Sequence, residues 1–281
     1  MNINSNTNTM CLLGHPIKHS FSPTIHNYLF EKYSENNIYV CFDVKEDKLK
    51  DCVYGIKGLD IKGCNVTIPH KVNIIKYLDS IDDNAKLIGA VNTIKNKGGI
   101  LKGYNTDGRG FVKSILDKGY DIKNKKVMII GGACRSIAIE MASQGVKSIE
   151  IRNRSLDRAN EIIDSINKNF NTEANCSKDA IDSSCLMDID ILINTTPIGM
   201  ESDLCPIDTN IVIDKKLLVC DIVYKPQNTA FLKWAKKNNL EIIYGIDMLI
   251  NQALEAFYIW TGINPCNEDF EHIKKLYENS I

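Results

Sequence analysis

Two charged residues of the sequence stand where a loop meets a predicted helix. In GCNVTIPHK, a strand ends at Thr67, Pro69 is suited to start a helix, and Lys71 falls in the first turn of that helix. In GYNTDGRG, Asp107 opens a second helix. Taken singly, a surface lysine and a helix N-cap explain both residues. If the two side chains converge and burial lowers the pKa of the lysine, its amine exchanges protons near neutral pH, so the pair predicts proton transfer.

Other polar side chains are placed to hold a small polar ligand. Ser22 precedes Pro23 in HSFSP and is suited to cap a helix, whereas Ser20 needs another explanation; two hydroxyls at a helix start also suit a carboxylate. Asn92 falls in a predicted strand, from which asparagine is usually depleted. Gln252 lies in the middle of an apolar helical face. Such residues predict specific hydrogen bonds.

A glycine-rich turn predicts a nucleotide site. Strand VMII runs directly into a turn and helix that begin with Gly131, Gly132, Ala133, Cys134 and Arg135. Backbone amides of such a turn can approach a diphosphate, although a plain tight turn is the alternative. The next strand ends about twenty residues later in RNRS (152–155), where NAD enzymes usually carry an acid. Arg154 and Arg158 suit a 2′-phosphate, which predicts NADP.

The elements that carry these residues alternate between strand and helix, which is typical of α/β folds. In the first third, residues 10–14, 38–44 and 63–68 are predicted strands, and residues 91–104 form a hairpin that turns at 96–99. From 107 to 243 the alternation becomes regular, with helices over 107–117, 133–144 and 156–169. This block is typical of a doubly wound nucleotide-binding sheet.

The last long helical pattern covers residues 246–262. The first third lacks a covering layer, so we expect this helix to fold back onto it. The predicted division is therefore a substrate-binding and catalytic domain of residues 1–106 plus 245–281, and an NADP-binding domain of residues 107–244.

Composition excludes several classes of protein. A net charge of −1 and a 25% share of charged residues give no sign of a nucleic-acid or polyanionic partner. No apolar run approaches the length of a membrane span, and the polar residues 1–9 do not resemble a signal peptide. The ten cysteines are scattered without a C-x-x-C pair. We therefore expect a cytoplasmic protein with reduced, mostly buried cysteines and no metal.

Together these clusters resemble the shikimate dehydrogenase family. The strings that carry the resemblance run in order along nearly the whole chain: HSFSP, NVTIPHK, GAVNT, YNTD, NRS, INTTPIGM, DIVYKP and MLINQALEAFYIWTG. The resemblance implies reversible reduction of 3-dehydroshikimate to shikimate by NADPH, a step in the synthesis of aromatic amino acids. It also implies two α/β domains in a monomer or homodimer.

The resemblance implies a role for individual residues as well. Lys71 and Asp107 would be the catalytic pair, with Lys71 exchanging the proton. The substrate carboxylate would be held by Ser20 and Ser22. The ring hydroxyls would be bound by Thr67, Asn92, Asp107 and Gln252, with Tyr224 nearby. NADP would be held by Gly131, Gly132, Ala133, Cys134, Arg135, Asn153, Arg154, Ser155 and Arg158, with Ile222 and Gly245 framing the nicotinamide and Asp83 touching the cofactor.

The glycine turn departs from the pattern of the family. That pattern usually reads Gly-Ala-Gly-Gly, two residues and Arg, and this turn is shorter by two residues. Losing backbone donors beside a diphosphate weakens binding or shifts its register. Two alternatives follow: a quinate or aminoshikimate dehydrogenase, or a relative that binds the ring acid without hydride transfer. The Ser20/Ser22 pair and Arg154 favour shikimate with NADP, and Lys71 with Asp107 favours an enzyme.

Overall fold

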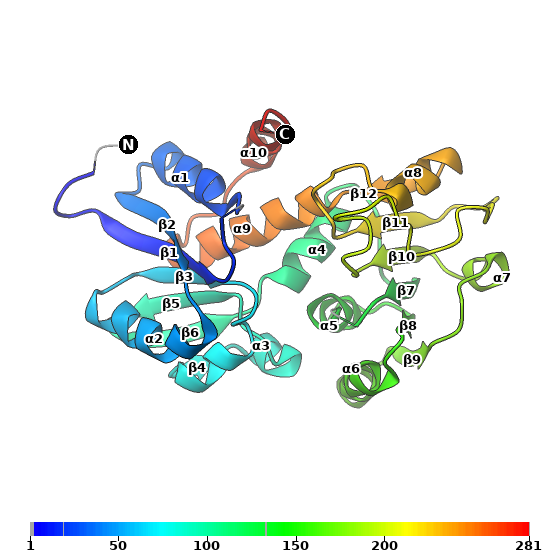
Figure 1. Ribbon diagram of the computed structural model, residues 1–281, viewed down its shortest axis with the longest axis horizontal. Helices are drawn as coiled ribbons and strands as arrows, with labels where there is room; N and C mark the ends of the chain where they lie inside the picture. Colours follow the sequence, from blue (N-terminus) through cyan, green and yellow to red (C-terminus); the bar gives the residue numbers. More distant parts are fainter. Residues whose placement is uncertain (1–2, 19, 133, 281) are drawn as a thin grey trace. The chain divides into compact units, whose positions relative to one another are not determined.

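The computed structural model describes residues 3–18, 20–132 and 134–280. The chain divides into two compact units, Met1–Asp107 with Ile250–Ile281, and Gly108–Leu249. We call these the first and second unit. Each is a six-stranded sheet with helices packed against it (Figure 1). The expected α/β class with two sheets is confirmed.

The sheet of the first unit is mixed, in the order β2-β1-β3-β5-β6-β4. Its strands are β1 (Asn8–Gly14), β2 (Asn37–Asp43), β3 (Gly63–Val66), β4 (Ser80–Ile81), β5 (Thr93–Lys97) and β6 (Ile100–Tyr104). Strands β1, β2 and β3 are parallel, whereas β5 is antiparallel to both β3 and β6. The predicted hairpin is confirmed as β5–β6, whose turn holds Gly98 and Gly99 at φ 62° and 84°, a conformation that favours glycine.

Helices cover both faces of this sheet (Figure 1). The helices of the unit are α1 (Ser22–Lys32), α2 (Leu49–Gly58), α3 (Asp83–Ile88), α10 (Asn267–Glu278) and most of α9 (Gly245–Thr261), with short 3-10 helices η1 (Glu46–Lys48) and η2 (Asn73–Tyr77). Because β1 is covered on both faces, its buried part reads as the continuous apolar run MCLL.

The long C-terminal helix returns to the first unit, as predicted. Trp260 of α9 donates from Nε1 to the carbonyl of Ile94 at 2.9 Å. A side chain at Gly63 would lie 2.5 Å from that indole, so the helix packs directly against the bare backbone of β3. Phe257 packs against Phe30 of α1, with 5.6 Å between the ring centroids.

The sheet of the second unit is entirely parallel, in the order β12-β11-β10-β7-β8-β9. Its strands are β7 (Lys126–Ile130), β8 (Ser148–Arg152), β9 (Glu173–Ser177), β10 (Ile191–Asn194), β11 (Leu218–Asp221) and β12 (Glu241–Ile243). Its helices are α4 (Asp107–Leu116), α5 (Arg135–Ser143), α6 (Leu156–Asn169), α7 (Ser183–Leu186) and α8 (Ala230–Lys237). The order reverses between β7 and β10, which makes this a doubly wound sheet with a switch point at the carboxyl end of β7.

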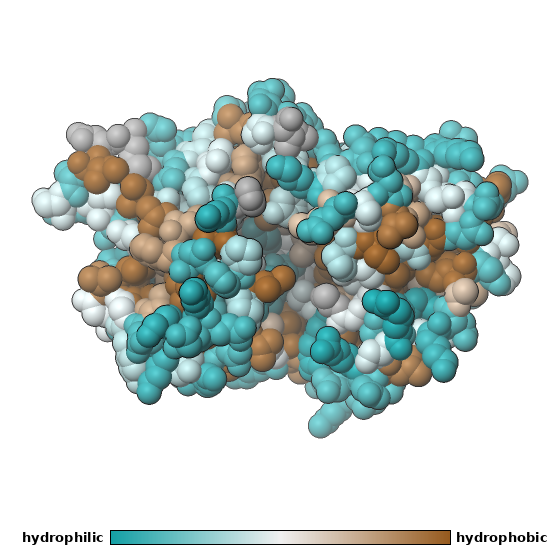
Figure 2. Space-filling view, viewed as in Figure 1, coloured by the Kyte–Doolittle hydropathy of each residue, from teal (hydrophilic) through white to brown (hydrophobic). Residues whose placement is uncertain are grey.

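Apolar side chains also reach the surface, where Figure 2 shows them in brown among hydrophilic residues. In the first unit, Ile68 and Val72 are 72% and 64% exposed. These two residues flank Lys71 in the sequence, so the segment that carries the lysine presents apolar surface.

All ten cysteines are free thiols. Across the described ranges, no helix has the length and apolar character needed to cross a bilayer. Within the same residues, no group of histidine, cysteine and acidic side chains is arranged to hold a metal ion.

Candidate active site

Lys71 is carried by a tight turn, not by a helix. The peptide bond between Ile68 and Pro69 is cis, and the His70 amide bonds to the Thr67 carbonyl at 2.9 Å. This is a turn with proline in its third position. The prediction of a helix starting at Pro69 is therefore wrong, because a proline that suits a helix start also suits a turn and its isomer is not visible in the local sequence.

The backbone on either side of Lys71 is anchored. The His70 ring is fully buried, and its Nε2 lies 2.6 Å from the carbonyl of Val44. The carbonyl of Lys71 itself accepts a hydrogen bond from the Val91 amide at 2.8 Å. These contacts fix the backbone from which the Lys71 side chain reaches its partner.

That partner is Asp107. Lys71 Nζ donates to Asp107 Oδ2 at 2.6 Å, and Asn92 Nδ2 donates to Asp107 Oδ1 at 2.8 Å. The amide of Asp107 bonds to Asn105 Oδ1 at 3.1 Å, which fixes the start of α4. The side chains of Lys71 and Asp107 are 30% and 16% exposed. The pair is therefore sheltered but open to a ligand, as a proton-transfer pair must be.

Asn92 lies one residue before β5 and not in the predicted strand. Its Oδ1 accepts from the Thr106 amide at 2.8 Å, and its Nδ2 donates to Thr106 Oγ1 at 2.9 Å as well as to Asp107. A backbone amide can only donate, so the orientation of the Asn92 side chain is determined. Thr106 Oγ1 also makes a long contact of 3.5 Å to Oε1 of Gln252 on α9. The structure thus brings together the predicted Lys71, Asp107, Asn92 and Gln252.

The start of α1 differs from the predicted one at both serines. The helix begins at Ser22 with Phe21 as its N-cap residue, so the predicted N-cap at Ser22 is wrong. Ser20 instead accepts a hydrogen bond from the Ser22 amide at 3.2 Å. Thr67 is positioned by a separate contact, in which its amide bonds to the Leu13 carbonyl at 2.9 Å, next to Gly14. A Cβ on that glycine would lie 2.3 Å from the Thr67 methyl group.

The glycine turn of the second unit follows β7. Gly131 has φ 107°, and a Cβ there would lie 2.7 Å from the methyl group of Thr196. A Cβ on Gly132 would lie 2.7 Å from Asn153 Nδ2. Helix α5 begins at Arg135, two residues later than predicted, with Cys134 as its N-cap residue. Ala133 lies outside the described residues. The turn therefore has no room for a side chain at Gly131 or Gly132.

Cys134 is a packing residue in this turn. Its side chain is fully buried, and burial raises the pKa of its thiol to about 12. A thiol that stays protonated is a small apolar group.

The arginines after β8 fall into two kinds. Arg152 is 10% exposed and its guanidinium bonds to Glu150 at 2.7 Å, which makes it part of the sheet face. Arg154 and Arg158 are exposed, and among the described residues neither makes an ion pair. Ser155 is exposed as well, and its carbonyl accepts from Asn153 Nδ2 at 2.7 Å. Two exposed cations therefore follow β8, the strand next to β7: Arg154 just before α6 and Arg158 in the first turn of that helix.

Gly245 makes a close backbone contact at the start of α9. A Cβ there would lie 2.5 Å from the carbonyl oxygen of Ile222 and 2.6 Å from that of Val223. Tyr224 follows in the same segment after β11, and burial raises the pKa of its hydroxyl. These residues belong to the second unit. Asp83, by contrast, lies on α3 of the first unit, where its 95% exposed carboxylate pairs with Lys86 at 2.7 Å.

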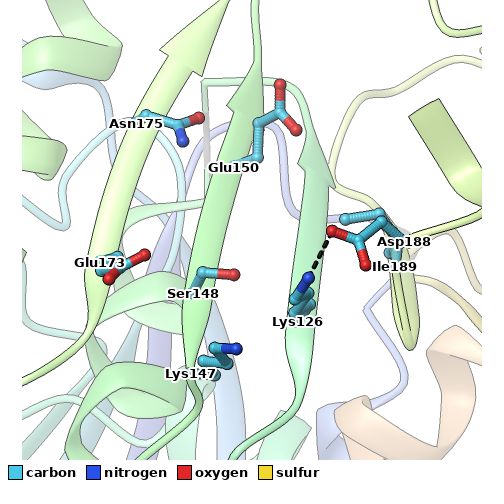
Figure 3. Close-up of a pocket in the computed structure, with 8 residues that line it drawn as sticks. All are labelled: Lys126, Lys147, Ser148, Glu150, Glu173, Asn175, Asp188 and Ile189. Atoms are coloured by element: carbon cyan, nitrogen blue, oxygen red, sulfur yellow. Dashed lines mark hydrogen bonds and ion pairs between the residues drawn. The ribbon is translucent and has the colours of Figure 1, made fainter.

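A separate polar pocket of about 260 Å³ lies on the second sheet (Figure 3). It is lined by Lys126, Lys147, Ser148, Glu150, Glu173, Asn175, Asp188 and Ile189. Lys126 points to Asp188 and forms an ion pair with it. On β8 the lining residues Ser148 and Glu150 alternate with buried ones, so this pocket is a partly exposed polar sheet face, and Lys126 and Ser148 lie at the amino ends of their strands.

The buried polar residues that are hydrogen-bonded, directly or through one another, to Asn92 were not predicted from the sequence. Tyr39, Asn65, Thr93 and Thr106 are all buried and hydrogen-bonded to one another or to Asn92. The available signal was the presence of Asn65 in an otherwise apolar strand.

Family models match most of the chain. The substrate-binding domain of shikimate dehydrogenase matches residues 12–94, and shikimate/quinate 5-dehydrogenase matches residues 111–222. The C-terminal domain of shikimate 5′-dehydrogenase matches residues 245–265.

Curated relatives and solved structures agree with these matches. The chain is 44% identical to shikimate dehydrogenase (NADP(+)) of Caldanaerobacter subterraneus subsp. tengcongensis, over 93% of this chain and 94% of the relative. It is 42% identical to the protein of the same name from Methanococcus maripaludis, over 99% of both chains. The crystal structure of shikimate 5-dehydrogenase from Listeria monocytogenes with shikimate and NAD is 33% identical, with a TM-score of 0.91 over 99% of this chain and 98% of that one.

A structural neighbour with another activity is 5-ketofructose reductase of a Gluconobacter strain, 30% identical with a TM-score of 0.87 over 97% of this chain and 100% of that one. Proteins of this fold therefore act on more than one substrate, and structural similarity alone does not identify the substrate. Identity over nearly the full length decides the family: the chain belongs to the shikimate dehydrogenase family.

Proposed function

We propose that this chain catalyses the reversible NADPH-linked reduction of 3-dehydroshikimate to shikimate. The observation that carries the proposal is the bond of 2.6 Å between Lys71 Nζ and Asp107 Oδ2, in which both side chains keep some exposure. The curated relatives named shikimate dehydrogenase (NADP(+)) support the same reaction and the same cofactor.

Lys71 has the role of proton donor and acceptor. In the direction of reduction, its Nζ donates a proton to the carbonyl oxygen of the substrate as that oxygen gains negative charge. In the direction of oxidation, Nζ takes the proton from the hydroxyl. Asp107 Oδ2 holds the amine in place, and Asn92 holds the other carboxylate oxygen. Positioned proton transfer of this kind contributes about 10²–10⁴-fold to a rate.

The second unit has the features that NADP needs. The backbone at Gly131 and Gly132 packs closely on Thr196 and Asn153, where a Cβ would lie 2.7 Å from a side-chain atom of each, and helix α5 begins at Arg135. Such a helix start binds a diphosphate through its free amides and its dipole. When bound, NADPH supplies the hydride. We assign diphosphate binding to Gly131, Gly132, Ala133, Cys134 and Arg135, and the nicotinamide edge to Ile222 and Gly245, with Asp83 as a further contact.

Arg154 and Arg158 select NADP over NAD by binding its 2′-phosphate. Arg154 and Arg158 are exposed cations without an ion-pair partner in the described part of the chain, and Asn153 and Ser155 lie beside them. A planar guanidinium binds a phosphate bidentately, and a hydrogen bond to a charged group contributes about 1.5–3 kcal/mol.

Substrate binding falls to the polar residues around Lys71. Ser20 and Ser22 at the start of α1 suit the carboxylate. Thr67, Asn92, Asp107 and Gln252 suit the ring hydroxyls, and Tyr224 of the second unit adds a further contact. The first unit is thus the substrate and catalytic domain, and the second the NADP domain. Free cysteines throughout the chain support a reducing compartment such as the cytosol.

Turnover with matched cofactors and substrates tests the proposal. Purified protein with shikimate and NADP should generate reduced nicotinamide, followed by its absorbance, and should do so much faster than with NAD. Quinate in place of shikimate should be a poorer substrate. Equal rates with NAD and NADP would contradict the role of the arginines, and turnover of quinate alone would transfer the proposal to that substrate.

The short glycine turn supports one other candidate, a protein that binds the ring acid without hydride transfer. Titration with NADPH separates the two readings. Binding of NADPH together with turnover supports the dehydrogenase. Binding of shikimate in the absence of any NADPH binding would favour the other candidate.

A further inference from the structure

A chain of buried hydrogen bonds ends on the catalytic carboxylate of the first unit. Tyr39 Oη donates to Asn65 Oδ1 at 2.7 Å, and Asn65 Nδ2 donates to Thr93 Oγ1 at 3.1 Å. Thr93 Oγ1 donates to Asn92 Oδ1 at 3.0 Å, and Asn92 Nδ2 donates to Asp107 Oδ1 at 2.8 Å. Tyr39, Asn65 and Thr93 are 2%, 6% and 0% exposed, so water does not compete for these bonds.

The direction of each bond is determined by groups that cannot reverse. Asn65 Nδ2 also faces the carbonyl of Asn92 at 3.2 Å, and a carbonyl can only accept. The Oδ1 of Asn65 must therefore face Tyr39, whose hydroxyl must donate. Because Asn65 Nδ2 donates to Thr93, the proton of Thr93 is free to point at Asn92 Oδ1, which is closer than Thr106 Oγ1 at 3.4 Å.

The fold holds the members of this chain in place. Asn65 of β3 and Thr93 of β5 are directly paired across the sheet. Tyr39 reaches them from β2, which lies on the other side of β1. Its ring stacks on the ring of His26 with centroids 4.4 Å apart, and the side chain of Asn27 bonds to both its backbone amide and its carbonyl.

We infer that Tyr39, Asn65 and Thr93 are positioning residues, which act through Asn92 to hold the Asp107 carboxylate toward Lys71. The inference rests on the proposed function. Every donor in the chain points toward the carboxylate, so the bonds polarise one another in the same direction. Removing the Tyr39 hydroxyl leaves the buried Oδ1 of Asn65 without this donor. Removing the Thr93 hydroxyl takes one donor from Asn92 Oδ1, which is then held by Thr106 alone and less firmly placed. The effect arrives at Asp107 as a misplaced carboxylate, although Tyr39, Asn65 and Thr93 are not themselves among the proposed substrate contacts.

Steady-state kinetics of hydroxyl-deletion variants test this inference. Tyr39→Phe and Thr93→Val each keep the shape of the side chain and remove its hydroxyl. Each should lower kcat by roughly 10- to 100-fold, because small misplacements of reacting groups have effects of that order. KM for shikimate should change less than kcat, because Tyr39 and Thr93 are not among the proposed substrate contacts. Thr93→Ser, which keeps the hydroxyl, should restore most of kcat.

The double variant separates a chain from two independent defects. If Tyr39 and Thr93 act in series, Tyr39→Phe with Thr93→Val should lower kcat no further than the more damaging single change. Tyr33→Phe is the matched control, because the Tyr33 hydroxyl is bonded to Asp269 of α10 at 2.6 Å and not to this chain. It should leave kcat unchanged. NADPH affinity of the second unit and the melting temperature report whether each variant is folded.

Each outcome bears on the inference. Turnover of Tyr39→Phe and Thr93→Val at the wild-type rate would overturn it, as would losses that multiply in the double variant or a Thr93→Ser enzyme as slow as Thr93→Val. If one variant fails to fold, the other single change and Thr93→Ser decide. Absence of turnover in the wild-type protein would overturn the proposed function itself, and the inference with it.

Discussion

At the scale of the residue, the side chains of Lys71 and Asp107 differ in how many hydrogen bonds hold them. The backbone of Lys71 is anchored in a turn, while its side chain has a single described acceptor, Asp107 Oδ2. Asp107 is held at both oxygens, by Lys71 and Asn92. The amine has three donors and one described acceptor, so it is the member of the pair with more hydrogen-bonding capacity left for a ligand.

This asymmetry predicts the effect of Lys71→Ala. Turnover should fall by about 10²–10⁴-fold, because the proton donor is lost, while affinity for shikimate is largely retained. Steady-state kinetics give the rate, and titration with shikimate gives the affinity. Lys76→Ala, at an exposed lysine of η2, is the control and should turn over normally. A Lys71→Ala protein with wild-type turnover would remove this residue from the mechanism.

The residue types were sufficient to predict that Lys71 and Asp107 could converge, and the structure pairs them, although a surface lysine and a helix N-cap explain each residue singly. They were not sufficient for the residues behind them. Asn65 is separated from Tyr39 by 26 positions and from Thr93 by 28. Only the pairing of strands reveals such contacts. Arg152 is a different case. The sequence presents it as a cation beside Arg154, but the structure pairs it with Glu150, so its charge is already neutralised.

At the scale of the element, close backbone contacts control where helices begin. Gly245→Ala should move the start of α9 away from Ile222, whose carbonyl oxygen lies 2.5 Å from the added Cβ. Overpacking of this kind destabilises by about 1–3 kcal/mol. The melting temperature and the affinity for NADPH should both fall.

Gly55→Ala is the matched control for that change. Gly55 lies within α2, and a Cβ there meets nothing within 4 Å. Alanine should stabilise this helix by about 0.5–1 kcal/mol, since glycine loses more conformational freedom on folding. Equal effects of the two substitutions would show that the contact at Ile222 is not restrictive.

Elements with a strong periodic pattern were predictable, whereas junctions were not. Helix α6 covers the residues 156–169 that its pattern predicts, and the hairpin turns at its glycines. The junctions at Pro69 and Ser22 were wrong, because one proline or serine fits several local structures. Strand β4 has only two residues, too few for any alternation to be visible.

At the scale of the whole molecule, a buried histidine makes stability depend on pH. Burial lowers the pKa of His26 from 6.5 to about 3, and the nearby Asn65 side chain opposes this only in part. An unfolded chain therefore binds a proton below about pH 6.5 that the folded protein does not bind until about pH 3. The free energy of unfolding should fall as the pH drops through this window.

The expected loss between pH 6 and pH 4.5 is about 2 kcal/mol for one such group. Urea unfolding at several pH values measures it. Asp269 adds to this loss only at lower pH. Burial raises its pKa, but hydrogen bonds from Lys32 and Tyr33 hold that pKa at about 2, so its stabilising effect is lost only when the pH falls below the ordinary value of 3.8. His26→Phe should flatten the curve above pH 4.5. An identical slope in that variant would assign the loss to other groups.

The division of the chain has a consequence for its synthesis. The first unit begins at the amino end but needs Ile250–Ile281, including Trp260 against Gly63, to complete its core. The second unit is encoded without interruption between these two parts. On the ribosome, the second unit can therefore finish folding before the first, because residues 250–281 of the first unit are translated after it. A chain cut before residue 250 would therefore contain nearly all of the second unit in folded form beside a first unit without a finished core.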